Sequence, residues 1–259
     1  MKKYISNLAV IQNTAINSQT HLLKLSSNSA LPTIIPGQFA ELRIDGTSDV
    51  FLRRPISVNF VDYTKNELWL LVQKVGKGTQ KLCELRENDN LNLLFPLGNG
   101  FTLPGDFTQK VLLIGGGVGV APLLFLAAEL AKLNCCITIL IGGRSADNLL
   151  LVNDFADYGK VYFTTEDGSA GERGYVTQHS ILANEKFDKI YCCGPTPMMK
   201  AVGQYACQKN IDCQISLENT MACGIGACLC CVTNTVDGHK CVCSDGPVFN
   251  INDIKWNND

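Results

Sequence analysis

Cysteine clustering near the carboxyl end constrains this chain more than any other feature. Six of the thirteen cysteines lie between residues 219 and 249. Cys223, Cys228 and Cys231 have the spacing C-x4-C-x2-C. Three thiolates in this order on one loop, with a fourth from a more distant strand, hold a [2Fe–2S] cluster of the plant type. The segment therefore predicts an iron–sulfur loop.

The fourth thiolate has to come from a cysteine further along the chain. An Asp-Gly pair ending at Gly238 indicates a hairpin that begins near Thr233 and returns the chain towards the loop. Either Cys241 or Cys243 would then approach the other three sulfurs. We predict Cys243, because it opens the turn Cys-Ser-Asp-Gly; Cys241 and Cys230 remain alternatives.

Two other uses of these thiols have to be weighed. Four thiolates also satisfy a structural zinc ion. Zinc sites usually pair two short C-x2-C knuckles, whereas here the first spacing is C-x4-C and contains Gly224 and Gly226, which allow a tightly wound loop. Disulfides are typical of secreted chains, but polar residues interrupt the segment after Lys2 and Lys3 where a leader would have an apolar core. The sequence favours an iron–sulfur cluster and a reducing cytoplasm.

Composition and charge limit the number of domains and the classes of partner that this chain can have. The 259 residues, 46% of them hydrophobic, can form two domains and a small third segment. A net charge of −2 without a run of lysine or arginine gives no footprint for nucleic acid or a membrane surface. The uncharged run 111–128 has the length of a membrane span, but it contains GGGVG and Pro122. It predicts a buried strand, a glycine turn and a helix.

The first part of the chain, residues 1–103, predicts a small antiparallel β-barrel. Six short runs there are alternating or rich in β-branched residues, with little helix between them. The expected strands are 4–17, 21–26, 38–44, 56–62, 68–75 and 91–95.

Two motifs in this barrel are candidates for binding a phosphate-bearing cofactor. In RRPIS, the Arg54 guanidinium can pair with phosphate and Ser57 supplies a hydroxyl. In VGKGTQKL, Gly78 and Thr79 stand at a strand-to-helix transition, where free N–H groups bind anions. Each motif alone has a plainer explanation, a strand start or a helix cap. Together, ahead of a nucleotide-binding pattern, they favour a cofactor site.

The second part, residues 104–216, predicts a parallel sheet with helices on both faces, because short apolar strands alternate with helix-length segments. A connector is expected at 104–108. The expected strands are 111–114, 137–141, 161–163, 190–193 and 214–216.

GGGVGVAP follows the first of these strands and predicts a pyrophosphate site at a helix N-terminus. Val120 stands where the Rossmann motif has its third glycine, so a close-packed strand–helix turn is the alternative. Arg144 alone follows the second strand as a basic residue, which favours NAD over NADP. The candidate glycines are Gly115, Gly116, Gly117 and Gly119.

These motifs, with CGPTPM at the end of the fourth strand, resemble those of the ferredoxin–NADP reductase superfamily. The resemblance implies that Arg54 and the glycine–threonine loop hold the FAD pyrophosphate, and that Ser57 lies beside flavin N5. It also implies a hydride-transfer cleft lined by Cys193 and its neighbours, whereas Cys192 is expected in the core. The flavin-site residues so implied are Arg54, Pro55, Ile56, Ser57, Leu71, Val72, Gln73, Gly78 and Thr79, and the cleft residues are Cys193, Gly194 and Met198.

The third segment, residues 217–259, narrows the resemblance. MACGIGACLCCV and CVCSDGPVF are similar to the electron-transfer subunits of B-type dihydroorotate dehydrogenase, and the similarity runs through RPIS, VGKGT and PLGNGF as well. It implies FAD, a [2Fe–2S] cluster and NAD(H) as co-substrate. It further implies an FMN-containing catalytic partner that oxidises dihydroorotate in pyrimidine biosynthesis, in a heterotetramer of two subunits of each kind. The implied cluster ligands are Cys223, Cys228, Cys231 and Cys243.

Other functions remain open at this stage. The flavin and iron–sulfur subunit of a ferredoxin-dependent NAD(P)H oxidoreductase or of a sulfide dehydrogenase is similar, but such chains often carry aspartate where Cys223 stands. A zinc-stapled adaptor without catalysis is a different class and would be colourless. The order of the parts favours electron transfer, because a flavin is needed between a two-electron nicotinamide and a one-electron cluster. After Phe249 we expect an ordinary C-terminal tail.

Overall fold

The first six strands close into an antiparallel barrel in the computed structural model, which describes residues 2–105 and 108–256. The strand order is β1-β2-β5-β4-β3-β6, and β6 pairs again with β1. This confirms the predicted barrel. The strands are β1 Tyr4–Ala15, β2 Thr20–Ser26, β3 Phe39–Leu42, β4 Arg54–Asp62, β5 Glu67–Gln73 and β6 Asn90–Leu97.

Alternation along the strands fills the barrel. Side chains of successive strand residues point to opposite faces, so every second one enters the core. In β5, Leu68, Leu70 and Val72 are fully buried in the barrel core. Helix α1 (Lys77–Cys83) covers one end and adds Leu82 to the same core. Each such side chain contributes about 1.5–3 kcal/mol through removal from water.

The second body is a seven-stranded sheet in the order β10-β9-β8-β7-β11-β12-β15, parallel except for β15 at one edge. Its five central strands confirm the predicted parallel sheet, and the short β10 and β15 extend it at the edges. Within the expected connector 104–108, residues 106 and 107 lie outside the described part of the chain. The strands are β7 Lys110–Gly116, β8 Cys136–Gly143, β9 Lys160–Thr165, β10 Glu172–Arg173, β11 Lys189–Cys193, β12 Asp212–Ser216 and β15 Val248–Asn250.

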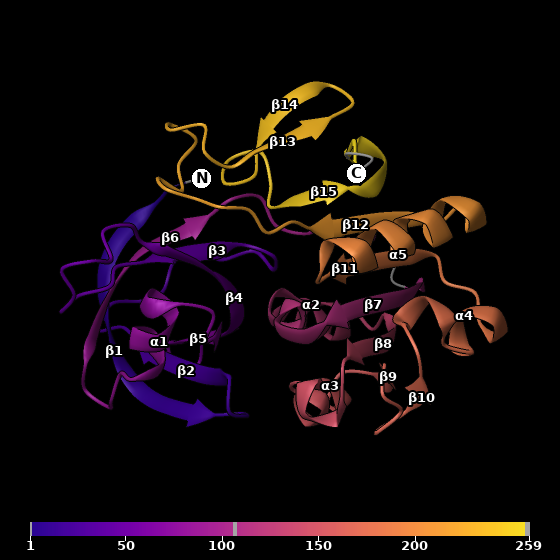
Figure 1. Cartoon of the computed structure of the whole chain (residues 1–259), viewed down its shortest axis with the longest axis horizontal. Coiled ribbons are helices and arrows are strands. Elements are labelled where there is room, and N and C mark those ends of the chain that lie inside the picture. The colour runs from indigo at the N-terminus through magenta and orange to yellow at the C-terminus, as the bar shows by residue number, and fades with distance from the viewer. Residues whose placement is uncertain (1, 106–107, 257–259) are drawn as a thin grey trace.

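Helix α2 (Ala121–Lys132) lies between the sheet and the barrel, which explains why the run 111–128 is apolar throughout (Figure 1). Phe125 reaches the barrel core and meets the ring of Phe60 at 5.9 Å. Asn59 of β4 donates a hydrogen bond of 2.9 Å to the Ala121 carbonyl. Across residues 2–105 and 108–256, none of the helices combines the length and apolar character needed to cross a bilayer.

Four shorter 3-10 segments and three more α-helices complete the second body and the C-terminal segment. Most of them are single turns, whereas α5 spans 14 residues. The 3-10 segments are η1 Gly117–Val120, η2 Ala146–Asn148, η3 Val176–Gln178 and η4 Ile251–Asp253, and the helices are α3 Val152–Ala156, α4 Ile181–Asn184 and α5 Thr196–Lys209.

The C-terminal segment crosses above both bodies (Figure 1). Its predicted hairpin is present, with β13 (Val232–Thr235) antiparallel to β14 (Gly238–Cys241). The segment does not stand apart, because β15 pairs with β12 of the nucleotide sheet.

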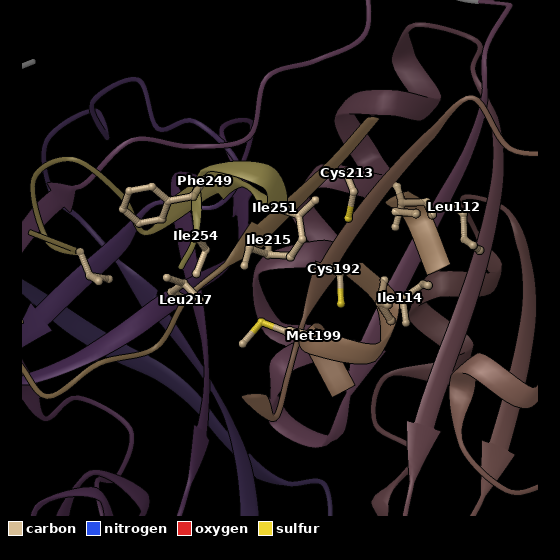
Figure 2. Packing of buried hydrophobic residues seen from close by; sticks show 14 of the residues in the cluster. Leu112, Ile114, Cys192, Met199, Cys213, Ile215, Leu217, Phe249, Ile251 and Ile254 are labelled. Atoms are coloured by element: carbon tan, nitrogen blue, oxygen red, sulfur yellow. The ribbon is translucent and has the colours of Figure 1, made fainter. Parts of the chain in front are cut away.

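The expectation of an ordinary tail after Phe249 is wrong for the described residues. Ile251 and Ile254 are buried in the core cluster that also holds Cys192 and Met199 (Figure 2). The end of the chain packs instead against α5 and β12, since a Cβ at Gly203 would lie 2.5 Å from Ile251 Cγ1 and Ile215 belongs to the same cluster.

Candidate iron–sulfur, flavin and nucleotide sites

The predicted cluster cysteines lie near one another in the folded chain. Cys228 neighbours Cys223, and Cys231 neighbours both Cys243 and Cys241. Cys228 is exposed, whereas Cys231 and Cys243 are buried at 2% and 1% exposure. A [2Fe–2S] cluster takes two thiolates on each of its two irons, and Cys223 with Cys228 and Cys231 with Cys243 would supply them.

Backbone N–H groups point at these sulfurs. Gly226 donates to Cys243 Sγ at 3.1 Å, Cys243 donates to Cys231 Sγ at 3.3 Å, and Ile225 donates to Cys223 Sγ at 3.5 Å. Gly224 and Gly226 have φ of 67° and 83°, the left-handed values that aim these amides inward. Hydrogen bonds to sulfur favour the thiolate form, which is the form that binds iron.

The first and fourth thiols differ in acidity because Cys243 is buried, whereas Cys223 is only partly so. Desolvation opposes ionisation of Cys223, but hydrogen bonds from the backbone of Ile225, Cys228 and Ala227 and from the Cys228 thiol lower its pKa to about 6. Burial, together with the neighbouring Cys231 thiol, raises the pKa of Cys243 to about 12. Metal ligation displaces the proton of a coordinating thiol, so iron binding at Cys243 is coupled to proton release.

The alternative ligands Cys230 and Cys241 have different surroundings. Among the described residues, no group of three or more cysteine, histidine, aspartate or glutamate side chains is already arranged to hold a metal ion. Cys230 is exposed, and Cys241 is held in β14 opposite Val232, with its N–H donating to Asp245 Oδ2 at 2.7 Å. The Cys241 thiol does contact Cys231, so proximity alone does not separate it from Cys243.

The turn that carries Cys243 is clamped by the end of the barrel. Asn99, from the motif PLGNGF, donates through its side chain to the carbonyls of Ser244 at 3.2 Å and Asp245 at 3.0 Å. At Gly98 (φ 74°), a Cβ would lie 2.5 Å from Pro247 Cδ. The barrel and the cysteine turn thus approach so closely that only glycine fits between them.

The two candidate flavin motifs meet in the barrel. A Cβ at Gly78 would lie 2.7 Å from Arg54 Nε, so the guanidinium rests directly on the glycine loop. Arg54 Nη1 is oriented by the Leu52 carbonyl at 2.7 Å. Thr79 acts on the loop itself, because its Oγ accepts from the N–H of Val75 at 2.9 Å and donates to the Gly76 carbonyl at 3.0 Å. The structure therefore brings Arg54 and Gly78 together and gives Thr79 a loop-closing position.

The remaining flavin-site candidates divide between surface and core. Pro55, Ile56 and Ser57 of β4 are partly exposed. Val72 is fully buried in the barrel core, and Leu71 is 2% exposed and packs towards the nucleotide-binding body. Gln73, at the end of β5, is partly exposed. A cofactor along β5 would meet Leu71 and Val72 chiefly through their backbone.

The two nucleotide motifs also meet. A Cβ at Gly119 would lie 2.5 Å from Gly194 Cα, and one at Gly116 would lie 2.7 Å from Met198 Sδ. At Gly117, with φ of 54°, a Cβ would meet no described atom within 4 Å and would face open space. The glycine turn after β7 is thus closed onto the turn after β11.

Cys192 and Cys193 lie on opposite faces of β11, in different core clusters. Cys192 is fully buried, which confirms its expected packing role. Cys193 is 1% exposed, and burial, reinforced by the Glu218 carboxylate, raises its thiol pKa well above the ordinary value. Cys193 is therefore a neutral thiol at the carboxyl end of its strand.

One residue of this region escaped the sequence reasoning. Glu41 of β3 is fully buried, and Gly224 of the cysteine loop covers it. The one signal for it in the sequence is a charged residue within the apolar strand FAEL. Burial raises the pKa of the Glu41 carboxyl to about 7, with opposing effects of Arg53 and Arg54 and a further increase from Cys223.

The fold and these sites define an oxidoreductase with a flavin-binding barrel, a nicotinamide-binding sheet and an iron–sulfur segment. Residues 113–204 match the oxidoreductase NAD-binding domain, and residues 218–255 match the iron–sulfur cluster binding domain of dihydroorotate dehydrogenase B. The chain belongs to the family of electron transfer subunits of dihydroorotate dehydrogenase B (NAD(+)).

The relatives that show this extend over nearly the whole chain. The electron transfer subunit of Geobacillus sp. (strain WCH70) is 38% identical over 95% of this chain and 97% of its own length. That of Caldanaerobacter subterraneus subsp. tengcongensis is 40% identical over 93% of this chain and 94% of its own length. The chain is therefore a component of an oxidoreductase that works with FAD, a [2Fe–2S] cluster and NAD(H), and a catalytic partner subunit is implied.

Solved structures agree on the fold. A chain of the NADH-dependent reduced ferredoxin–NADP oxidoreductase superposes with a TM-score of 0.87 at 30% identity, over 96% of this chain and 90% of that one. A ferredoxin reductase of carbazole 1,9a-dioxygenase gives a TM-score of 0.71 at 20% identity, over 82% of this chain and 67% of that one, and shows the fold alone. The first of these represents the rival class, but the curated relatives at 34–40% identity are dihydroorotate dehydrogenase B subunits.

Proposed function

We propose that this chain carries electrons between NAD(H) and an FMN-containing dihydroorotate dehydrogenase subunit, in a cytoplasmic heterotetramer of two subunits of each kind that serves pyrimidine biosynthesis. The observation that supports it most is the packing of the cysteine loop onto the barrel, where Gly224 lies against Glu41 and Leu97. Cluster, flavin and nucleotide sites then belong to one continuous structure. When bound, FAD exchanges a hydride with NAD(H) and single electrons with the cluster, which passes them on.

Different residues of the chain are proposed to bind the flavin and the nucleotide. Arg54, resting on Gly78, supplies a fixed positive charge for a pyrophosphate at the glycine loop, while Thr79 holds that loop closed. Ser57 presents a partly exposed hydroxyl on the same strand as Arg54. In the second body, the turn at Gly117 leaves open space for the nucleotide, beside Met198.

Cys193 and Gly194 end the strand that faces this turn. The neutral Cys193 thiol adds no charge to the cleft, which suits contact with an uncharged dihydronicotinamide. Cys223, Cys228, Cys231 and Cys243 hold the cluster, and the amides of Ile225 and Gly226 support two of the sulfurs. The division into residues 1–103, 104–216 and 217–259 assigns one cofactor or co-substrate to each part.

The partner is proposed to dock on the exposed side of the cysteine loop. Ile225 and Leu229 flank Cys228 there and are 45% and 65% exposed. Apolar side chains beside an exposed cluster ligand favour a protein contact at the point where electrons leave. Replacing both by aspartate should abolish co-purification with the catalytic subunit while iron and flavin contents stay unchanged; co-purification at the level of the unaltered chain would rule out this surface.

An absorption spectrum of the pure protein before and after NADH, under argon, tests the proposed function as a whole. Bleaching of both the flavin and the iron–sulfur bands is expected. A flat visible spectrum together with one zinc per chain would mean that the chain is a zinc-stapled adaptor instead. Addition of the catalytic subunit and dihydroorotate, in place of NADH, should bleach the same bands.

A further inference from the structure

Glu41 occupies the interface between the barrel and the iron–sulfur loop. In β3, Ala40 and Leu42 enter the barrel core, so Phe39 and Glu41 lie on the opposite, outer face. A Cβ at Gly224 would lie 2.7 Å from Glu41 Cγ and 3.1 Å from Glu41 Oε1. The loop that begins at Cys223 therefore covers the carboxyl group and leaves it 0% exposed.

Neither carboxyl oxygen of Glu41 has a hydrogen-bond partner among the described residues. The Arg53 guanidinium is engaged elsewhere, because it donates to the backbone carbonyl of Glu41 at 3.1 Å and to Asn92 Oδ1 at 2.6 Å. A buried carboxylate without a partner is strongly disfavoured, so the charge of Glu41 must be sensitive to what surrounds it.

The surroundings of Glu41 make its charge sensitive to charge in the loop. From β4 and the residue before it, Arg54 and Arg53 favour the ionised form; from the loop, Cys223 disfavours it. The partner positions in the neighbouring strands, Pro55 in β4 and Leu94 in β6, carry no charge. Burial is the largest influence on its pKa, and a negative charge added in the loop acts in the same direction.

We propose that the Glu41 carboxyl takes up one proton when the iron–sulfur cluster held by the loop above it accepts one electron, and releases that proton when the electron leaves. An O–H bond forms on Glu41 with a proton from solvent, and the electron comes from the flavin or the partner subunit. The added negative charge is thus neutralised inside a region that excludes water. This inference rests on the proposed cluster ligation by the cysteine loop.

The test is a redox titration of the purified holoprotein between about pH 6 and pH 9, followed by the electron paramagnetic resonance signal of the reduced cluster. In the unaltered chain, the equilibrium constant for reduction of the cluster should fall about tenfold per pH unit within part of this range. This corresponds to a fall in reduction potential of about 59 mV per pH unit for a one-electron couple. In Glu41→Gln, the potential should be independent of pH and lie at the low-pH limit of the unaltered chain, because glutamine imitates the protonated acid.

A matched control is Glu87→Gln, which changes an exposed carboxylate elsewhere on the barrel and should keep the full pH dependence. A flat potential in the unaltered chain, or an unchanged slope in Glu41→Gln, would overturn the proposal. If the glutamine variant loses its cluster, infrared difference spectra of the unaltered chain test the proposal instead. A carboxylic acid band must then appear on reduction, and its absence would overturn the proposal. Absence of iron and labile sulfide from the unaltered protein would overturn the ligand assignment as well, whereas a loaded cluster with a flat profile overturns the role of Glu41 alone.

Discussion

The amide of Gly226 donates a 3.1 Å hydrogen bond to the sulfur of Cys243, which ties the loop between the first two cluster cysteines to the turn that carries the fourth. Two segments that are separate in sequence are fixed against each other at the sulfur atom itself.

This bond leads to a prediction about the fourth ligand. Cys243→Ser should abolish the cluster, because a hydroxyl binds iron poorly and the buried site cannot recruit water. Cys241→Ser should keep it, since the Cys241 backbone is held by Asp245 and the loop amide of Gly226 donates to the Cys243 sulfur instead. Iron and labile sulfide per chain measure both; a cluster retained in the first variant and lost in the second would reverse the assignment.

Removal of an exposed cluster ligand should abolish the cluster without affecting the flavin. Cys228→Ser should eliminate the cluster bands but leave FAD bound and reducible by NADH, because Cys228 is far in sequence from the flavin motifs and exposed at the surface. Cys230→Ser changes a neighbouring cysteine that is also exposed; it serves as the control and should retain the cluster. Anaerobic spectra with NADH report both centres, and loss of flavin reduction in a variant that still contains FAD would contradict the proposed electron order.

Flavin affinity should depend on the contact between Arg54 and Gly78. Gly78→Ala places a methyl group 2.7 Å from Arg54 Nε and must displace the guanidinium. A charged hydrogen bond is worth about 1.5–3 kcal/mol, so FAD binding should weaken by about one to two orders of magnitude, as in Arg54→Ala. Flavin fluorescence titration of the reconstituted protein measures this. Gly105→Ala, with no described atom within 4 Å, should bind FAD normally.

The nucleotide site should be sensitive at Gly119. A methyl group there would lie 2.5 Å from Gly194 Cα and 2.6 Å from the Cys193 carbonyl, which is backbone that cannot move aside cheaply. We expect Gly119→Ala to raise the Kd for NADH and to lower the free energy of unfolding by about 1–3 kcal/mol through overpacking. Stopped-flow reduction of bound FAD and thermal unfolding check the two effects. Unaltered NADH affinity would show that NADH binding does not require close packing of the turn after β7 against the turn after β11.

Stability should respond to pH through Glu41. Burial raises the pKa of this carboxyl to about 7, above its value in the unfolded chain. The contribution of the protonated acid is complete at pH values below the unfolded pKa and is lost as the pH rises through about 7. Glu41→Gln should therefore raise Tm relative to the unaltered chain at alkaline pH, by an amount that disappears towards about pH 5. Equal Tm differences across this range would show that Glu41 does not titrate in the folded protein.

The sequence by itself determined the parts of this protein. Alternating apolar residues in the first hundred positions and buried runs between helical segments specify the barrel and the parallel sheet, because these periods follow from local backbone geometry. The spacing of Cys223, Cys228 and Cys231 and the motifs at Arg54 and Gly115 likewise each lie within one short stretch of sequence. Such short-range features are readable without knowledge of the fold.

Only the tertiary structure decided how these parts meet. It placed β15 in the nucleotide sheet, buried Ile254 where an ordinary tail was expected, turned the Thr79 hydroxyl onto its own loop, and set Gly224 on Glu41. Each of these arrangements depends on which side chains are buried away from water and on which groups, distant in sequence, they then contact. The replacement of water by such contacts is decided between segments remote in sequence, and no local pattern encodes it.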